Sequence, residues 1–226
     1  MKYSKPFLHR VRYSAFRALG TAVAMLLFPS GSDFAHSLAA PPAHSSGAEV
    51  AISAAAAQSA AEKVRQIQEA SNGRTGGVLA EFSEEEVDSY LAYEMASDYP
   101  AGVSKVQVRF LPARILGTSE VDFDKAKAAR RIPSGIADYL FGGVHTLSVE
   151  GGFSAIDGVG QFDLESVALD GFVLPQMLVN LLIETFLKPR FPDLALEDPF
   201  LLPYSIDRVQ VMRERIVVEV NPPTAY

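Results

Sequence analysis

The 226-residue chain contains no cysteine and no tryptophan. Without cysteine it can form neither a disulfide framework nor a thiolate metal site. Without tryptophan it offers no indole ring on which a sugar could stack. These two absences exclude the disulfide-stapled scaffolds and weaken a sugar-processing function.

Basic residues are also scarce, at 20 Lys and Arg against 27 Asp and Glu. Residues 1–40 hold five of the basic residues and one of the acidic ones, so the chain without them has a formal charge of −11. Nucleic-acid binding relies on Lys and Arg that neutralise phosphates. The charge therefore argues against a nucleic-acid partner and against simple electrostatic adhesion to anionic membranes.

The N-terminus combines a basic region, a mostly apolar run over 18–28 and small residues at 37–40; the basic residues are Lys2, Lys5, Arg10, Arg12 and Arg17. This order is typical of a secretory signal peptide, which we place at residues 1–40. As a helix, the apolar run reaches roughly 16 Å, about half of the 30 Å hydrocarbon core of a bilayer. We therefore expect a periplasmic or secreted protein. An uncleaved anchor and a disordered basic tail on a cytosolic protein are the alternatives.

Residues 41–76 read as a leader followed by an Ala-rich spacer. The stretch from Glu49 to Ala70 favours helix through its alanine content. Its first half offers little bulky apolar surface for docking, so it is expected to be helical or partly disordered. Residues 77–226 are then predicted to form a single domain.

The domain alternates strand and helix signals. Ser83 and Glu86 form a capping box in front of a helix that ends at Tyr99-Pro100, and Asp157-Gly158 is a hairpin signal. Strands are predicted over 103–110, 115–123, 144–153, 160–173, 206–212 and 216–220, with a short helix over 133–141. Strands outnumber helices and neighbouring strands look antiparallel, so the predicted class is α+β.

The most informative segment is a predicted helix from Gln176 to Leu187. Nearly all of its residues are apolar, and Asn180 and Glu184 leave only a narrow polar stripe. A surface helix normally shows one apolar face, so this helix is expected to be covered on most sides.

The candidate catalytic and metal-binding residues do not combine into a site. His145 lies in a strand-like segment and reads as a surface or satisfied sheet residue rather than a member of a catalytic triad. Asp122, Asp124 and Glu120 do not have the spacing of a calcium loop. Asp163 and Glu165 would share one strand face, as acidic residues on strands often do. The expected protein is not an enzyme and has no metal and no cofactor.

The glycine pairs Gly142-Gly143 and Gly151-Gly152 lack the spacing of a phosphate-binding loop. They are expected to mark bulges or bends in a strongly curved sheet. What remains is apolar surface: long strands and an apolar helix can enclose an elongated cavity, or the helix can form the core of a compact domain.

The order of elements resembles small exported bacterial proteins of the tubular lipid-binding (BPI-like) superfamily. The resemblance rests on Phe82–Leu91, Val106–Val108, Ile115–Gly117, Val121–Phe123 and Leu169–Pro175, and it spans about residues 81–220. It implies a curved antiparallel sheet wrapped around a long apolar helix, with acyl chains held between them. It implies no catalytic residues.

Three functional hypotheses follow. The first is a non-enzymatic envelope protein that binds a lipid or another long apolar ligand, close to the membrane, through Leu178, Val179, Leu182, Ile183 and Phe186. The second is a structural or interaction protein of the envelope with a dry core and no ligand. The third is an enzyme that acts on envelope polymers through Asp163 and Glu165.

Overall fold

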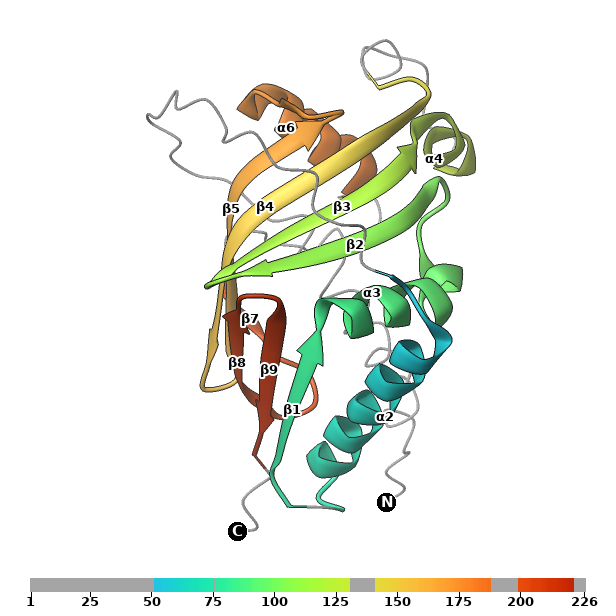
Figure 1. Ribbon diagram of the computed structural model, residues 1–226. Helices are drawn as coiled ribbons and strands as arrows, with labels where there is room; N and C mark the ends of the chain where they lie inside the picture. The colour runs from blue at the N-terminus through green and yellow to red at the C-terminus, as the bar shows by residue number, and fades with distance from the viewer. Residues whose placement is uncertain (1–50, 75, 131–140, 188–198, 222–226) are drawn as a thin grey trace, which may run out of the picture.

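The computed structural model describes residues 51–74, 76–130, 141–187 and 199–221. The predicted signal peptide (1–40), the leader that follows it and most of the predicted helix over 133–141 lie outside these ranges. Within them, helices pack against one antiparallel sheet, which confirms the α+β class (Figure 1). No helix in these ranges is both long enough and apolar enough to cross a membrane.

The first part of the fold is a helix, a strand and a second helix: α2 (Ala54–Ser71), β1 (Val78–Ser83) and α3 (Glu84–Tyr93). The Ser53 hydroxyl caps α2 by accepting a hydrogen bond from the Ala56 N–H at 3.1 Å. The predicted capping box of α3 is confirmed, because Ser83 and Glu86 satisfy each other's backbone N–H groups. A short 3₁₀ turn, η1 (Ala96–Asp98), follows α3.

The centre of the fold is a meander of long strands that form two hairpins: β2 (Val103–Leu111), β3 (Arg114–Asp122), β4 (Val144–Ile156) and β5 (Val159–Leu169), with α4 (Phe123–Arg130) after β3. The predicted turn between β4 and β5 is confirmed. Asp157 and Gly158 both have positive φ, at 53° and 76°, as a two-residue hairpin turn requires.

The last part returns along the sheet through short elements: β6 (Phe172–Val173), α6 (Gln176–Leu182), a π-helical turn η2 (Ile183–Leu187), β7 (Phe200–Leu201), β8 (Ile206–Met212) and β9 (Arg215–Val220). The predicted hairpin through residues 213–215 is confirmed by the register of β8 and β9.

The sheet order is β1-β9-β8-β4-β3-β2, and β5 lies on the other side of β4 with β6 and β7 at its ends. The β8–β9–β1 ribbon joins β4 just beyond the start of β3, through the pairing of Ala155 with Val209. Figure 1 shows the ribbon below the long strands, with α2 beside it and α6 at the opposite end of the molecule. The predicted bulge at Gly151-Gly152 is confirmed by a register shift after Glu150.

Two finer expectations about the sheet and its helix are wrong. The sheet is not strongly curled, and it does not wrap a long apolar helix. The predicted helix over 176–187 is α-helical for only seven residues before it widens into a π-helical turn. It lies at one end of the sheet, and Met177 near its start is 75% exposed.

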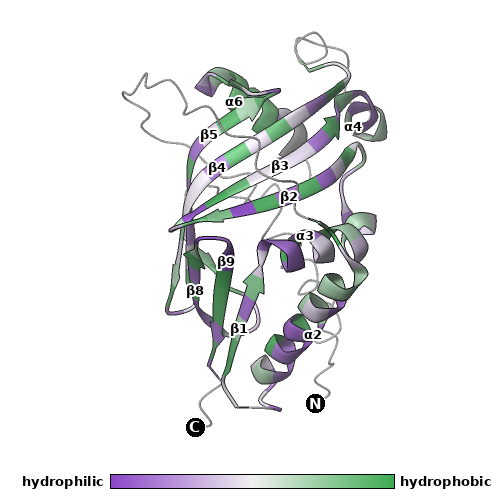
Figure 2. Cartoon of the chain, in the orientation of Figure 1, coloured by the Kyte–Doolittle hydropathy of each residue, from purple (hydrophilic) through white to green (hydrophobic). Residues whose placement is uncertain are grey.

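The Ala-rich stretch is helical and packs into the domain core instead of standing apart as a spacer. Its buried residues recur at helical spacing on one face: Ala57, Ala60, Val64, Ile67 and Ala70. That face contacts α3, β1 and β9. Figure 2 shows hydrophilic residues on the rest of the helix. Small alanine side chains allow the helix axis to come close to its neighbours, so α2 encloses the interior beneath it.

Candidate functional site

The sequence-predicted apolar contacts lie on α6 and the turn after it. Val179, Leu182 and Ile183 are buried and belong to the hydrophobic core, and Leu178 is half-buried against it. The side chain of Phe186 is outside the described part of the chain. The structure therefore brings the first four into the core at the α6 end of the sheet, and it does not test their role in ligand binding.

A different part of the molecule contains an apolar pocket of about 120 Å³. Its walls come from α2, α3, β1, β2, β4, β8, β9 and the segment around β7. The lining residues are Ala60, Val64, Ile67, Phe82, Val87, Tyr90, Leu91, Val108, Phe110, Phe153, Phe200, Leu202, Pro203, Ile206, Val209, Ile216 and Val218. Of these, Tyr90 alone has a polar side chain. None of the α6 residues lines this pocket.

The walls of the pocket differ in exposure. The helix α2 and the strands contribute deeply buried side chains, such as Ile67 and Val108, each 2% exposed. Tyr90, Leu202 and Pro203 are only half-buried. The pocket is thus lined by buried aliphatic and aromatic side chains together with half-buried ones.

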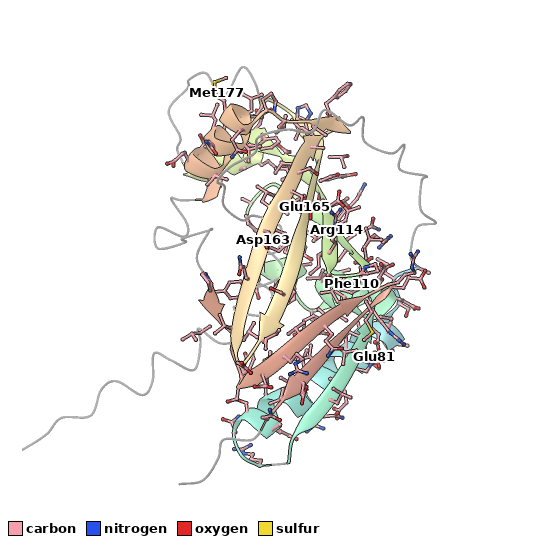
Figure 3. All side chains as sticks on the ribbon, turned by 90° about the vertical axis from the view of Figure 1, so that its left-hand side faces the viewer. Glu81, Phe110, Arg114, Asp163, Glu165 and Met177 are labelled. Carbon is pink, nitrogen blue, oxygen red and sulfur yellow. The ribbon has the colours of Figure 1, made fainter. Side chains whose placement is uncertain are left out.

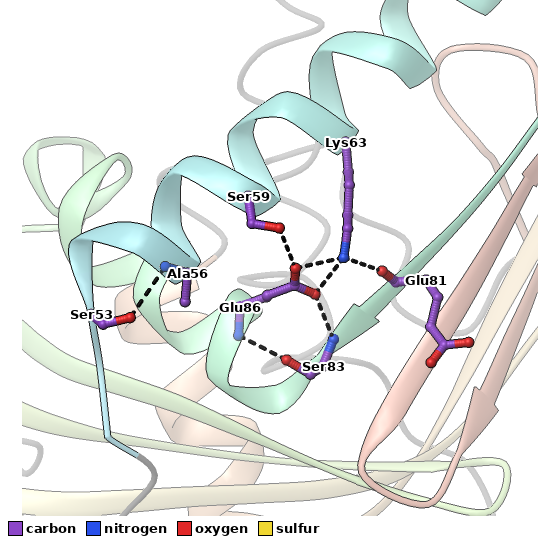
Figure 4. Close-up of polar contacts among 7 residues, drawn as sticks. All are labelled: Ser53, Ala56, Ser59, Lys63, Glu81, Ser83 and Glu86. Atoms are coloured by element: carbon purple, nitrogen blue, oxygen red, sulfur yellow. Dashed lines mark hydrogen bonds and ion pairs between the residues drawn. The ribbon is translucent and has the colours of Figure 1, made fainter.

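Helix α2 is held over the pocket by a polar cluster that centres on Glu86 of α3 (Figure 4). Lys63 donates hydrogen bonds to both Glu86 carboxylate oxygens, at 2.5 and 2.7 Å, and to the Glu81 carbonyl at 2.6 Å. The Ser59 hydroxyl donates to the same carboxylate at 2.6 Å. We call Ser59, Lys63 and Glu86 the α2 clasp.

The pKa of Glu86 reflects two opposing effects. Burial raises it, but the hydrogen bonds from Lys63, Ser59 and the Ser83 N–H outweigh burial and bring it below the ordinary value. Glu86 is therefore ionised at neutral pH, and the α2 clasp is an ion pair in its working state.

The other candidate catalytic and metal-binding side chains form hydrogen bonds within the fold. His145 has Asp170 at 2.6 Å from Nδ1 and the Gly142 carbonyl at 2.6 Å from Nε2. Because both ring nitrogens face an oxygen acceptor, neither is free to activate a nucleophile. The Asp122 carboxylate accepts from the Lys125 N–H at the start of α4, and Asp124 accepts from the Gly143 N–H.

The carboxylate pair on β5 lies on one exposed face, as its spacing predicts. Glu165 forms an ion pair with Arg114 at 2.9 Å, beside it in Figure 3, and Asp163 accepts from Gln161 at 3.1 Å. Neither carboxylate lines the apolar pocket. Across the described ranges, no three His, Asp or Glu side chains gather closely enough to hold a metal ion.

Searches with this chain find no matching protein-family model and no matching curated protein.

Sequence reasoning missed the pocket because its residues come from eight separate elements. One signal was available: the spacing of Ala60, Val64 and Ile67 predicts a helix with an inward face. That signal was weak because alanine is only slightly hydrophobic. Other lining residues are distant in the sequence: Val218 comes more than 150 residues after Ile67. The topology of the sheet alone brings them next to α2.

Proposed function

We propose that this chain is an exported, non-enzymatic protein of the cell envelope that binds an apolar ligand in the pocket beneath α2. The observation that carries the proposal is the pocket itself, about 120 Å³ with almost entirely apolar walls. Small-molecule sites are usually concave and apolar with few polar groups, as this one is.

An empty apolar pocket lowers the stability of a folded protein. Protein interiors are close-packed, and unfilled apolar volume destabilises a fold because the atoms that line it lose contacts. A ligand that fills the volume would recover part of that free energy, whereas water in an apolar cavity would not. The pocket is better suited to an apolar occupant than to solvent.

The volume limits the ligand. An engineered apolar cavity of about 150 Å³ accepts benzene, so this pocket has room for one ring or for the end of an alkyl chain. A longer lipid would place its terminal segment among the buried walls and leave the rest of its chain outside the pocket. The N-terminal pattern supports a periplasmic or secreted location.

The first test is to produce the full chain in a bacterial host that exports it, purify it without detergent, and combine native mass spectrometry with lipid extraction. An apolar species bound at a defined stoichiometry is the expected result. A ligand-free mass would favour the alternative function, a structural or interaction protein of the envelope with a dry core.

A pair of variants on α2 locates the site. Ala60→Leu extends a side chain into the pocket, whereas Ala55→Leu makes the same change on the exposed face of the helix. We expect Ala60→Leu to remain folded and lose the ligand, and Ala55→Leu to retain it. Equal retention in both would contradict binding in this pocket.

A third variant addresses the contacts predicted on α6. Leu178 is half-buried, so Leu178→Asp can be accommodated more easily than a charge at Leu182, which is 4% exposed. If ligand is lost in folded Leu178→Asp and kept in Ala60→Leu, the binding site lies on α6 as the sequence pattern predicts. The opposite result places it beneath α2.

A further inference from the structure

One wall of the pocket comes from a short segment that includes β7, Phe200–Pro203, which we call the β7 strap. Phe200, Leu202 and Pro203 line the pocket, and all three are half-buried. Leu201, between them in the chain, is 84% exposed. The lining residues of α2, β2 and β4 are buried instead. The β7 strap is therefore an outer wall, with the pocket on one side and solvent on the other.

Few backbone contacts hold the β7 strap. Its strand is two residues long and, in the described ranges, pairs only with the start of β5. One further hydrogen bond runs from the Leu202 N–H to the Gly158 carbonyl oxygen at 2.8 Å. By contrast β9, which also lines the pocket, pairs along its whole length with both β1 and β8. Segments with few backbone bonds and few buried contacts open locally while the rest of a protein stays folded.

The backbone after the strap is suited to act as a hinge. Tyr204 and Ser205 follow it directly and both have positive φ, at 58° and 51°, a region that residues other than glycine rarely adopt. Holding two successive residues there requires free energy that the closed fold supplies. Opening the strap lets both residues return to ordinary backbone angles, and hinges are short loop segments that absorb such changes.

The two helices that wall the pocket are held more firmly. The inward face of α2 is a continuous row of buried residues, and the α2 clasp adds the ion pair between Lys63 and Glu86. Helix α3 is joined to β2 by the Glu84 and Asp88 carboxylates, which accept hydrogen bonds from its backbone N–H groups. The free energy of opening rises with the apolar area exposed to water. The strap, with only half-buried apolar side chains, therefore opens more readily than α2.

We propose that the β7 strap is the gate of the pocket. It moves away from β5 about Tyr204 and Ser205 to admit or release the ligand, and it closes again while α2 stays in place. This inference rests on the proposed function and adds the route by which the ligand enters. A bound ligand that contacts Phe200 and Leu202 would hold the strap closed.

The test locks the strap with a disulfide in the variant Val159→Cys/Leu201→Cys. These two residues are opposite each other in the pairing of β5 with β7, are 40% and 84% exposed, and do not line the pocket. Opposite residues of antiparallel strands have Cα atoms about 4.5–5.5 Å apart, a distance that a disulfide can bridge. The unmodified chain has no cysteine, so it is the control for the reductant.

The probe is fluorobenzene, because a single ring matches the volume of the pocket. Fluorine NMR measures its dissociation rate and its affinity for the full-length exported protein, after any bound lipid has been extracted. We expect the oxidised variant to release the probe about tenfold more slowly than the reduced one, because the remaining routes require a packed helix or a long strand to open. The dissociation constant should be the same in both forms, because a gate slows entry and exit alike.

A second pair of variants tests the strap without a disulfide. A Cβ at Gly160 would lie 2.8 Å from the Phe200 ring and 3.1 Å from Leu202, whereas at Gly152 its nearest neighbour would be 3.7 Å away. Gly160→Ala therefore pushes the strap away from β5 and should release the probe faster, and its Leu202 amide should exchange faster with deuterium. Gly152→Ala, on the neighbouring strand, should behave as the unmodified chain.

The outcomes separate this inference from the proposed function. If the probe binds and leaves the oxidised and reduced forms at the same rate, the pocket binds ligands and the strap is not its gate. If Lys63→Ala speeds release while the disulfide changes nothing, α2 is the moving wall. If the double variant does not fold, equal release from Gly160→Ala and Gly152→Ala overturns the inference. If the probe does not bind the unmodified chain, the proposed function fails and the inference fails with it.

Discussion

Asp88 on α3 accepts a 2.7 Å hydrogen bond from the backbone N–H of Val108 on β2. One helical turn earlier, Glu84 accepts a 2.6 Å bond from the N–H of Phe110. Four residues of helix rise about 6 Å, and two residues of strand rise about 6.6 Å. The two carboxylates therefore match two successive outward N–H groups of the strand.

These contacts cover one edge of the sheet. In the strand order β2 is the edge strand, and β3 is its only partner strand in the described part of the chain. Its outward carbonyls are also satisfied: Val108 accepts from the Arg109 side chain at 2.8 Å, and Phe110 accepts from the Glu214 N–H at 3.0 Å. Exposed edge strands pair with other chains, so α3 protects the fold against such pairing.

The first prediction concerns Asp88, whose side chain is fully buried and also pairs with Arg109 at 2.9 Å. Asp88→Ala leaves the Val108 N–H and the guanidinium without this partner, so the free energy of unfolding should fall by about 2–3 kcal/mol. Urea denaturation at neutral pH measures the loss. Asp98→Ala, at an exposed position, is the control, and an equal loss in both variants would contradict the role of Asp88.

The second prediction is a pH dependence that comes from His145 and Asp170. Hydrogen bonds to Asp170 and to the Gly142 carbonyl raise the pKa of His145 above its ordinary value. Hydrogen bonds from His145 and the Thr146 N–H lower the pKa of Asp170. The histidine contribution is complete below the unfolded pKa of about 6.5 and is lost as pH rises through the raised folded pKa.

The aspartate contribution has the opposite sign. It is present above the unfolded pKa of about 3.9 and is lost as pH falls through the lowered folded pKa. Thermal unfolding over a pH series should therefore show a plateau between these limits. In His145→Gln the loss on the alkaline side of the plateau should disappear, and an unchanged alkaline slope would show that another group is responsible.

Local signals in the sequence were sufficient for the long strands β2, β3, β4 and β5, for the β8–β9 hairpin and for the turns, but they did not reveal β1 or α4. Asp157-Gly158 predicts a tight hairpin because both residues tolerate positive φ, and the capping box at Ser83 and Glu86 predicts the start of α3 from side-chain chemistry alone. Such features depend on a few neighbouring residues. Their physical cause is therefore visible in the sequence.

Features that depend on distant residues were not predictable in the same way. The buried face of α2, which includes Val64 and Ile67, packs against α3 and β9. No local pattern in the sequence reveals that these elements present a complementary surface. The apolar run over 176–187 indicates burial on most sides, yet Met177 is exposed because the helix lies at the end of the sheet. The pocket likewise exists only once β8, β9 and α2 are neighbours.

The third prediction concerns the α2 clasp. Lys63→Ala removes the cationic partner of Glu86, whose side chain is 15% exposed, so the free energy of unfolding should fall by about 1 kcal/mol. Backbone amides of residues 54–71 should exchange with deuterium faster, because α2 opens more often. Arg65→Ala removes exposed pairs with Glu62 and Glu69 on the same helix and should change little. Equal effects of the two substitutions would show that the clasp does not hold α2.

The fourth prediction compares two adjacent glycines on β4. A Cβ at Gly151 would lie 2.4 Å from the Phe162 ring and 2.6 Å from the Asp163 carbonyl oxygen, whereas at Gly152 its nearest neighbour would be Glu165 at 3.7 Å. Gly151→Ala should therefore destabilise the protein by about 1–3 kcal/mol through overpacking. Gly152→Ala should be neutral or stabilising, because alanine loses less backbone entropy on folding. Urea denaturation of both variants measures the difference. Similar stabilities would show that the Phe162 ring and the Asp163 backbone both shift to admit a Cβ, so that close packing is not what requires glycine at position 151.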